Sequence, residues 1–131
     1  MGIKSSFLRI IWIALKRNDR KSIYFSVYAP TNKYQMDLKE SFYAQIDDEL
    51  RRLRSKFGKG VEIIIGGDFN ARIDNKDELW NSVRGSFVND ILNENGLMFL
   101  EFCMRNNLKI TNTFFRKKIM VHGRIQGINH G

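Results

Sequence analysis

The sequence predicts a mixed α/β fold, because strand-like and helix-like segments alternate along the chain. Residues 22–28 (SIYFSVY) and 61–65 (VEIII) are rich in β-branched and aromatic side chains, which is typical of strands. Between them, residues 35–57 carry apolar side chains spaced three and four apart, the pattern of one face of a helix. A strand, a helix and a second strand in this order indicate a layered α/β protein.

The composition supports one globular domain with a basic surface. The chain has 131 residues, of which 43% are hydrophobic, and this is enough for one modest domain with a packed core. The formal net charge of +8 favours a polyanionic partner, either nucleic acid or an anionic surface, although a basic surface without a partner is the alternative. The single cysteine, Cys103, excludes an internal disulfide and lies in an apolar helical pattern that predicts burial.

The first segment, residues 5–15, is apolar and predicts a strand that forms a β-hairpin with residues 22–28. Asn18 and Asp19 lie in the polar run between them and favour a turn. Arg9 interrupts this apolar run, and no small-residue cleavage site follows the run. The run is also too short to cross a bilayer. We therefore expect no membrane segment and no secretion, and an intracellular protein that is nuclear or cytoplasmic.

The helix predicted over residues 35–57 has one apolar stripe and a basic C-terminal end, and Gly58 is a natural stop. The cations of its last turns suit the helix dipole, but they also suit contacts with phosphate, and both explanations stay open. The stripe consists of Leu38, Phe42, Ile46, Leu50, Leu53 and Phe57, and the cations are Arg51, Arg52, Arg54 and Lys56.

The run GGDFN follows the strand over residues 61–65, and its glycines are expected to end that strand. If the chain stays extended, alternation places Asp68 and Asn70 on one side and turns Phe69 toward the core. A carboxylate and an amide then lie together at the C-terminal end of a strand, where ligands and catalytic groups tend to bind. Such an acid can hold a hard cation or orient a water, whereas the alternative is ordinary turn chemistry.

The C-terminal half predicts a loop, a helix and a strand. Residues 71–87 are polar and irregular, with Trp80 and Phe87 as isolated anchors. Residues 93–96 (NENG) predict a helix start with an Asn cap, and the Asn pair at 106–107 predicts a left-handed end. Residues 108–115 predict a strand, and 116–131 have no usable period. One face of the helix is expected to carry Leu97, Leu100, Cys103 and Met104.

Three stretches resemble the endonuclease/exonuclease/phosphatase superfamily, whose fold is DNase I-like. They are VYAPTN (27–32), GDFNARI (67–73), and NENGLMFLEFC with LKITNTFF (93–115). The resemblance covers about residues 9–116 and is strongest to the endonuclease domains of non-LTR retrotransposons and to craniofacial development protein 2-like proteins. It implies a four-layer α/β/β/α sandwich, incomplete here, and hydrolysis of phosphodiester or phosphomonoester bonds with a divalent metal, usually Mg²⁺. The implied partner is DNA, bound without sequence preference.

The resemblance also implies roles for three residues. Asp68 is similar to the carboxylate that orients or deprotonates the attacking water, and it is the one residue placed near the metal. Asn70 resembles the partner of that carboxylate, which hydrogen-bonds the phosphate or the nucleophile. Tyr28 resembles the tyrosine that contacts the scissile phosphate, although a half-buried strand tyrosine is the structural alternative.

The sequence departs from the family pattern in two places. The sequence holds no counterpart of the Asn and the metal-binding Glu that the family carries on strands before the YAP run. It also lacks the Ser-Asp-His run. Asn129 and His130 resemble that run only weakly, and His122 resembles it less. Relatives continue with Thr-Trp and a Pro-containing segment, and a frameshift near residues 118–120 would hide such a segment (GTWQDPRHQPW) and make 119–131 aberrant. We therefore expect one partial domain that is inactive alone and binds Mg²⁺ weakly at Asp68. The alternatives are a non-catalytic nucleic-acid-binding module or a pseudogene product on the same fold.

Overall fold

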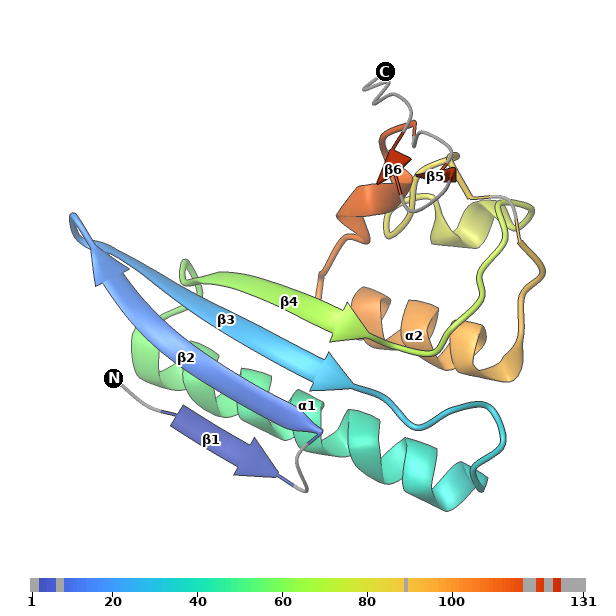
Figure 1. Ribbon diagram of the computed structural model, residues 1–131. Helices are drawn as coiled ribbons and strands as arrows, with labels where there is room; N and C mark the ends of the chain where they lie inside the picture. Colours follow the sequence, from blue (N-terminus) through green and yellow to red (C-terminus); the bar gives the residue numbers. More distant parts are fainter. Residues whose placement is uncertain (1–2, 7–8, 89, 117–119, 122–123, 126–131) are drawn as a thin grey trace. The chain divides into compact units, whose positions relative to one another are not determined.

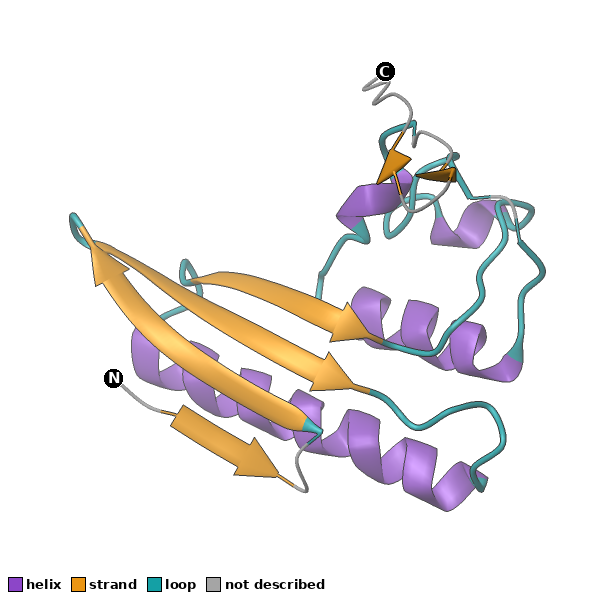
Figure 2. Cartoon of the chain, viewed as in Figure 1, coloured by secondary structure: helices purple, strands orange, loops and turns teal. Residues whose placement is uncertain are grey.

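The computed structural model describes residues 3–6, 9–88, 90–116, 120–121 and 124–125. This part of the chain is mixed α/β, as predicted, and it forms two compact units, Met1–Ala71 and Arg72–Gly131. Figure 1 traces the chain, and Figure 2 shows that the first unit holds the long strands and one long helix, whereas helices and loops dominate the second.

The first unit is a four-stranded sheet with one helix along it (Figure 1). The strand order is β1 (Ile3–Ser6), β2 (Ile10–Arg17), β3 (Arg20–Tyr28) and β4 (Glu62–Asp68). Neighbours are antiparallel up to β3, but β3 and β4 are parallel, and helix α1 (Met36–Phe57) is the connection between them. A parallel pair requires such a crossover, so the predicted strand–helix–strand order is confirmed.

The single strand predicted over residues 5–15 is wrong, since two strands share that segment. β1 ends at Ser6, β2 begins at Ile10, and these two residues are directly paired. The apolar pattern conceals the boundary between the two strands because the run contains no Gly, Pro, Asn or Asp to mark it. The hairpin of β2 and β3 is confirmed, and both of its turn residues, Asn18 (φ 48°) and Asp19 (φ 66°), have the left-handed backbone that tight hairpins need.

Helix α1 covers one face of the sheet, and the core of the first unit lies between them (Figure 1). The middle of the predicted stripe is buried, but Leu38 at its start is 39% exposed and Phe57 at its end is half-buried. The helix ends at Gly58 (φ 93°), as predicted. The buried side chains are Phe42, Ile46, Leu50 and Leu53 of α1 and Ile10, Trp12, Ile23, Phe25 and Val27 of the sheet.

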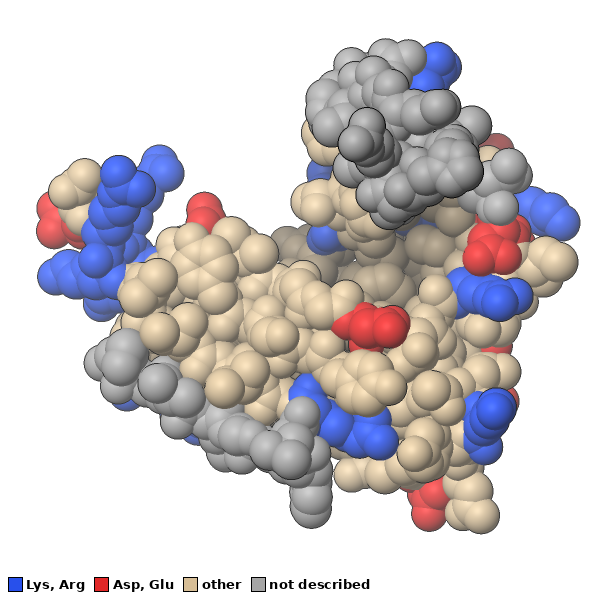
Figure 3. Space-filling model, viewed as in Figure 1, with Lys and Arg blue, Asp and Glu red and all other residues tan. Residues whose placement is uncertain are grey.

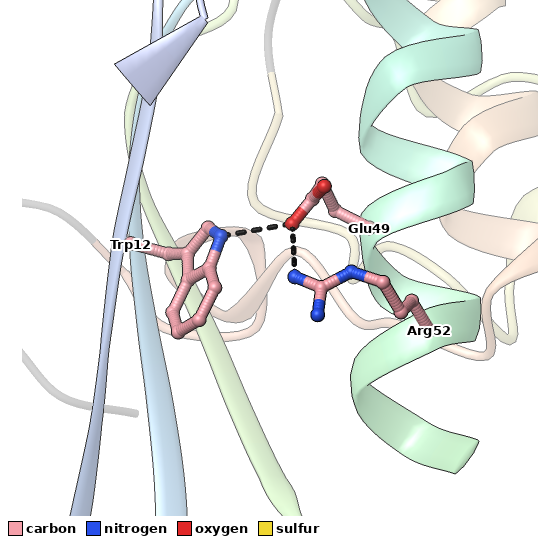
Figure 4. A network of polar contacts seen from close by, with 3 residues as sticks. All are labelled: Trp12, Glu49 and Arg52. Carbon is pink, nitrogen blue, oxygen red and sulfur yellow. Dashed lines mark hydrogen bonds and ion pairs between the residues drawn. The ribbon is translucent and has the colours of Figure 1, made fainter. Parts of the chain in front are cut away.

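A hydrogen bond links α1 to β2 (Figure 4). The indole Nε1 of Trp12 donates a hydrogen bond of 2.9 Å to Oε2 of Glu49, and Arg52 donates to the same oxygen at 2.9 Å. The guanidinium of Arg52 also lies 5.7 Å from the centre of the Trp12 ring. Arg51 forms an exposed ion pair with Asp48, so these two arginines of the basic cluster have structural partners.

The opposite face of the sheet carries exposed apolar side chains. Ile11, Tyr24 and Ile64 are 47%, 39% and 44% exposed. Strand β4 is accordingly not a fully buried strand, because Ile64 on this face is 44% exposed and Ile63 and Ile65 on the other face are half-buried. A run of apolar residues does not reveal whether one or both faces of its strand are covered.

The second unit is built around helix α2 (Glu94–Arg105), and the start predicted for this helix is confirmed. The side-chain oxygen of Asn93 accepts hydrogen bonds from the backbone N–H of Gly96 (2.7 Å) and of Arg72 (3.1 Å). The left-handed stop is confirmed at Asn107 (φ 57°). The remaining elements of this unit are the 3₁₀ turns η1 (Glu78–Trp80) and η2 (Thr111–Thr113) and the short strands β5 (Met120–Val121) and β6 (Arg124–Ile125).

The buried face of α2 is only partly the predicted one. Leu100 and Cys103 are buried, whereas Leu97 and Met104 are 40% and 38% exposed. The helix is rotated because Gly96 packs against the backbone of Arg72, where an added Cβ would overlap the carbonyl oxygen. Buried positions that the pattern missed are Asn95, Gly96 and Phe102.

The strand predicted over residues 108–115 is wrong. Ile110 forms one isolated bridge with Arg84, and the chain then turns into η2. The hydroxyl of Thr113 donates a hydrogen bond to the Ile110 carbonyl oxygen and accepts one from the backbone N–H of Gly85. These two backbone groups therefore bond to a side chain and not to a neighbouring strand.

In the preceding loop Trp80 is buried, as predicted, but Phe87 is 38% exposed and is not a buried anchor. None of the helices in the described residues combines the length and the apolar character that spanning a membrane requires. His122, the pair at 129–130 and the proposed frame change at 118–119 lie outside the described residues.

Candidate functional site

The candidate site lies at the carboxyl ends of β3 and β4. The two strands are parallel and in register to their last residues, so Tyr28 lies directly beside Asp68. The N–H of Ala29 donates to the carbonyl oxygen of Asp68 at 2.8 Å and continues the pairing one step further. The prediction that Gly66 and Gly67 end the strand is therefore wrong, because β4 runs through both of them to Asp68.

Gly67 is needed for close approach of the two strands. Its φ is 128°, a conformation that side chains rarely adopt, and a Cβ there would overlap the carbonyl oxygen of Val27. At Gly66, in contrast, the nearest atom to an added Cβ is the Phe25 carbonyl oxygen at 4.0 Å. Gly67 thus holds Asp68 beside Tyr28.

Asp68 and Asn70 come together through a turn. The backbone N–H of Asn70 donates to Oδ1 of Asp68 at 2.8 Å, and Asn70 has a left-handed backbone (φ 47°). The extended chain that would place both side chains on one side by alternation is therefore wrong, and the turn chemistry foreseen as the alternative is present. Phe69 is half-buried and is not a core residue. The Nδ2 of Asn70 donates to the carbonyl oxygen of Ala29 at 2.8 Å, which fixes the amide against the end of β3.

Arg9 supplies positive charge beside Tyr28. Its NH1 donates to the Tyr28 carbonyl oxygen at 3.2 Å, and its guanidinium carbon lies 5.7 Å from the Tyr28 ring centre and 5.4 Å from that of Tyr34. Tyr28 itself is 53% exposed, more than a half-buried strand residue would be. The sequence reasoning missed Arg9, and the signal was present, because it is the one charge within the apolar run 7–15.

Lys39 supports the loop that follows Tyr28. It is 1% exposed, and its Nζ donates to the carbonyl oxygen of Asn32 at 3.1 Å. This lysine was also missed, although its spacing of three and four from Phe42 and Tyr43 places it on the buried side of α1. A charged group placed under a loop of the site holds that loop's backbone in position.

Among the residues that the structure describes, the candidate site offers a Mg²⁺ ion one carboxylate, that of Asp68. Mg²⁺ requires near-octahedral oxygen ligands and is held in proteins by carboxylates together with substrate phosphates and waters. Asp68 is exposed, and one of its oxygens already accepts the N–H of Asn70. In the part of the chain that the structure describes, no three His, Cys, Asp or Glu side chains gather as a metal site.

Fold and site together define an α/β protein with a carboxylate, an amide, a tyrosine and an arginine at one edge of a mixed sheet. A comparison with protein-family models matches the family described as "Endonuclease-reverse transcriptase" over residues 23–122, which include most of β3 and all of α1, β4 and α2. The chain therefore belongs to this family, within the endonuclease/exonuclease/phosphatase superfamily and of retrotransposon type. Comparisons with curated proteins and with solved structures give no match.

Proposed function

We propose that this chain carries part of the phosphodiester-binding site of a divalent-metal-dependent endonuclease domain, and that the 131-residue polypeptide on its own binds DNA without cleaving it. The observation that carries the proposal is the register of Tyr28 with Asp68 at the carboxyl ends of two parallel strands. The family relationship supports the chemistry, and the net charge of +8 supports a polyanionic ligand.

Some residues of the site would bind phosphate, and others would orient a water. The guanidinium of Arg9 and the hydroxyl of Tyr28 are a cation and a donor for phosphate oxygens. Oδ1 of Asp68 accepts the N–H of Asn70, and its second oxygen is then the acceptor that would orient a water. Positioning of this kind and donors aimed at developing charge are the main requirements of phosphoryl transfer.

Cleavage would need groups beyond these. One exposed carboxylate does not displace enough water from Mg²⁺ to hold it tightly. The Ser-Asp-His run, whose His stabilises charge on the phosphate in the family, is not in this sequence. We therefore assign Asp68, Asn70, Tyr28 and Arg9 to binding and positioning in this polypeptide.

The proposal includes the DNase I-like sandwich and a nuclear or cytoplasmic location. In that sandwich a second sheet would pack on the exposed apolar face of the first unit, where Ile11, Tyr24 and Ile64 lie. Burial of such side chains is favourable by about 25 cal/mol per Å² of apolar surface, so this face has a physical reason to be covered.

DNA binding is tested by fluorescence anisotropy with a labelled duplex of about 20 base pairs, at about 50 and about 200 mM salt. We expect weak binding that falls steeply with salt, because each phosphate contact releases condensed counterions. Arg9→Gln should lower the salt slope by about 0.9, one phosphate contact, whereas Lys76→Gln, an exposed lysine of the second unit, should lower it less. An absence of binding at low salt, or binding without salt dependence, contradicts the proposal.

A non-catalytic basic module on the same fold is the second candidate, and the net charge favours it equally. Asp68→Asn separates the two candidates in metal-free buffer. If phosphate binds at the candidate site, removal of the nearby negative charge should strengthen binding about threefold to tenfold, the effect of one Coulomb contact of about 1 kcal/mol between groups that are exposed to water. If DNA binds elsewhere on the surface, the substitution should leave the affinity unchanged.

A further inference from the structure

A dense group of cations occupies the far end of the β2–β3 hairpin. The hairpin tip, residues 16–21, contains four exposed cations and one acid, Asp19. Figure 3 shows Lys and Arg side chains gathered over this end of the first unit. The cations are Lys16, Arg17, Arg20 and Lys21.

The pairing of these cations opposes folding. Lys16 lies directly across from Lys21, and Arg17 directly across from Arg20. Like charges at directly opposed positions destabilise a strand pair. The tight turn does not require them, since Asn18 and Asp19 supply its left-handed backbone.

The end of α1 extends the positive charge. The ring of Phe57 has the Nζ of Lys21 at 5.5 Å from its centre and the Nζ of Lys56 at 5.4 Å. The acid at this end of β4, Glu62, accepts a hydrogen bond from the hydroxyl of Ser22 at 3.3 Å. Cations therefore outnumber acids at this end of the sheet.

Strand β3 connects the hairpin tip to the candidate site. Arg20 is its first residue and Tyr28 its last, so the hairpin tip and the candidate site lie at opposite ends of the same strand. Eight residue steps at about 3.3 Å separate the two ends by roughly 26 Å. This corresponds to about eight base-pair steps of 3.4 Å, so one duplex is long enough to reach both.

We propose that the hairpin tip is a second contact for the phosphate backbone of nucleic acid, remote from the candidate site. It rests on the proposed function in one respect, that the polyanion is nucleic acid. The tip would hold the duplex by charge alone, without reading bases, and would position it relative to Tyr28 and Asp68.

The test compares two variants that each remove two positive charges. Arg17→Gln/Arg20→Gln changes the hairpin tip, and Arg51→Gln/Lys76→Gln is the matched control at exposed positions elsewhere. Loss of two phosphate contacts should lower the slope of log Kobs against log salt by about 1.8 and weaken binding about 60-fold at about 0.1 M salt. The control should change both quantities much less.

Stability separates a binding role from a structural one. Because Arg17 and Arg20 repel each other, Arg17→Gln/Arg20→Gln should raise Tm by roughly 2–4 °C while it weakens DNA binding. A variant that binds less tightly because it has lost structure would melt at a lower temperature. A second hairpin variant, Lys16→Gln/Lys21→Gln, should reproduce the loss of binding.

The outcomes distinguish the two proposals. If Arg9→Gln and Asp68→Asn act as expected but the hairpin variant binds like the control, the hairpin proposal is wrong and the candidate site stands. If the hairpin variant alone weakens binding, the candidate site is wrong and the hairpin is the DNA contact. If the chain binds vesicles rich in phosphatidylserine through these arginines and does not bind DNA, the ligand class is wrong.

Discussion

Replacement of Gly67 by alanine tests how the candidate site is assembled. Gly67 has φ 128°, and an added Cβ would overlap the Val27 carbonyl oxygen and lie 2.8 Å from the Val27 nitrogen. Both atoms belong to the backbone of β3, so relief requires the two strands to move apart. That movement would separate Asp68 from Tyr28.

The expected cost follows from two effects at this position. A non-glycine residue in such a backbone conformation costs about 1–3 kcal/mol, and separation of β3 from β4 costs further hydrogen bonds of about 1 kcal/mol each. Gly67→Ala should therefore lower the free energy of unfolding by about 3 kcal/mol or more. Gly66→Ala is the matched control, because a Cβ there meets nothing closer than 4.0 Å, and we expect a change within about 0.5 kcal/mol.

Urea unfolding followed by tryptophan fluorescence measures both variants. With a slope of about 1–3 kcal/mol per molar urea, the Gly67→Ala midpoint should fall by at least about 1 M. The Gly66→Ala midpoint should stay close to that of the parent chain. Equal midpoints for the two variants would refute the close approach of β4 to β3 at Gly67.

Three further predictions concern stability. Glu49→Ala should cost about 1–3 kcal/mol, because the buried indole N–H of Trp12 loses its acceptor. Asn93→Ala should cost about 1–2 kcal/mol, since two backbone N–H groups lose theirs. Burial raises the pKa of the Cys103 thiol from 9.0 to about 12, against a smaller lowering by Arg105, so the thiol should resist alkylation in the folded chain. The contribution of this thiol to the free energy of unfolding is constant below about pH 9. It should fall by about 2 kcal/mol by about pH 10.5, because the unfolded chain loses the thiol proton more readily than the folded chain.

Each of these predictions has its own control. Asp48→Ala, which breaks an exposed ion pair, should change stability by less than about 1 kcal/mol, and an equal loss in Glu49→Ala would remove the argument from Trp12. Asn93→Asp keeps the side-chain acceptor, so its free energy of unfolding should stay close to that of the parent chain. For the thiol, the pH effect is the difference between the parent chain and Cys103→Ala, and no difference between them would contradict it.

The periodic elements were predictable because one physical signal dominates each of them. The middle of the apolar stripe of α1, the Asn93 cap and the Asn-Asp turn are local patterns, and the structure confirms these three. The strand predicted over 108–115 was wrong because the Thr113 hydroxyl forms hydrogen bonds with backbone groups. Strand propensity does not account for such side-chain bonds.

The structure brings the three predicted site residues together, but not through the predicted geometry. The motif pointed to Tyr28, Asp68 and Asn70, which the structure places together, but alternation gave the wrong reason for the contact between the last two. Arg9 was missed because its closeness to Tyr28 depends on the register of β2 with β3, which is a long-range property of the sheet.

The most direct test of the central claim is Mg²⁺-dependent nicking of supercoiled plasmid by the purified 131-residue chain, beside Asp68→Ala. We expect no nicking above the Asp68→Ala level, because the described site offers Mg²⁺ one exposed carboxylate. Nicking that Asp68→Ala abolishes would contradict it. Residues other than Asp68, Asn70, Tyr28 and Arg9 would then have to complete the active site.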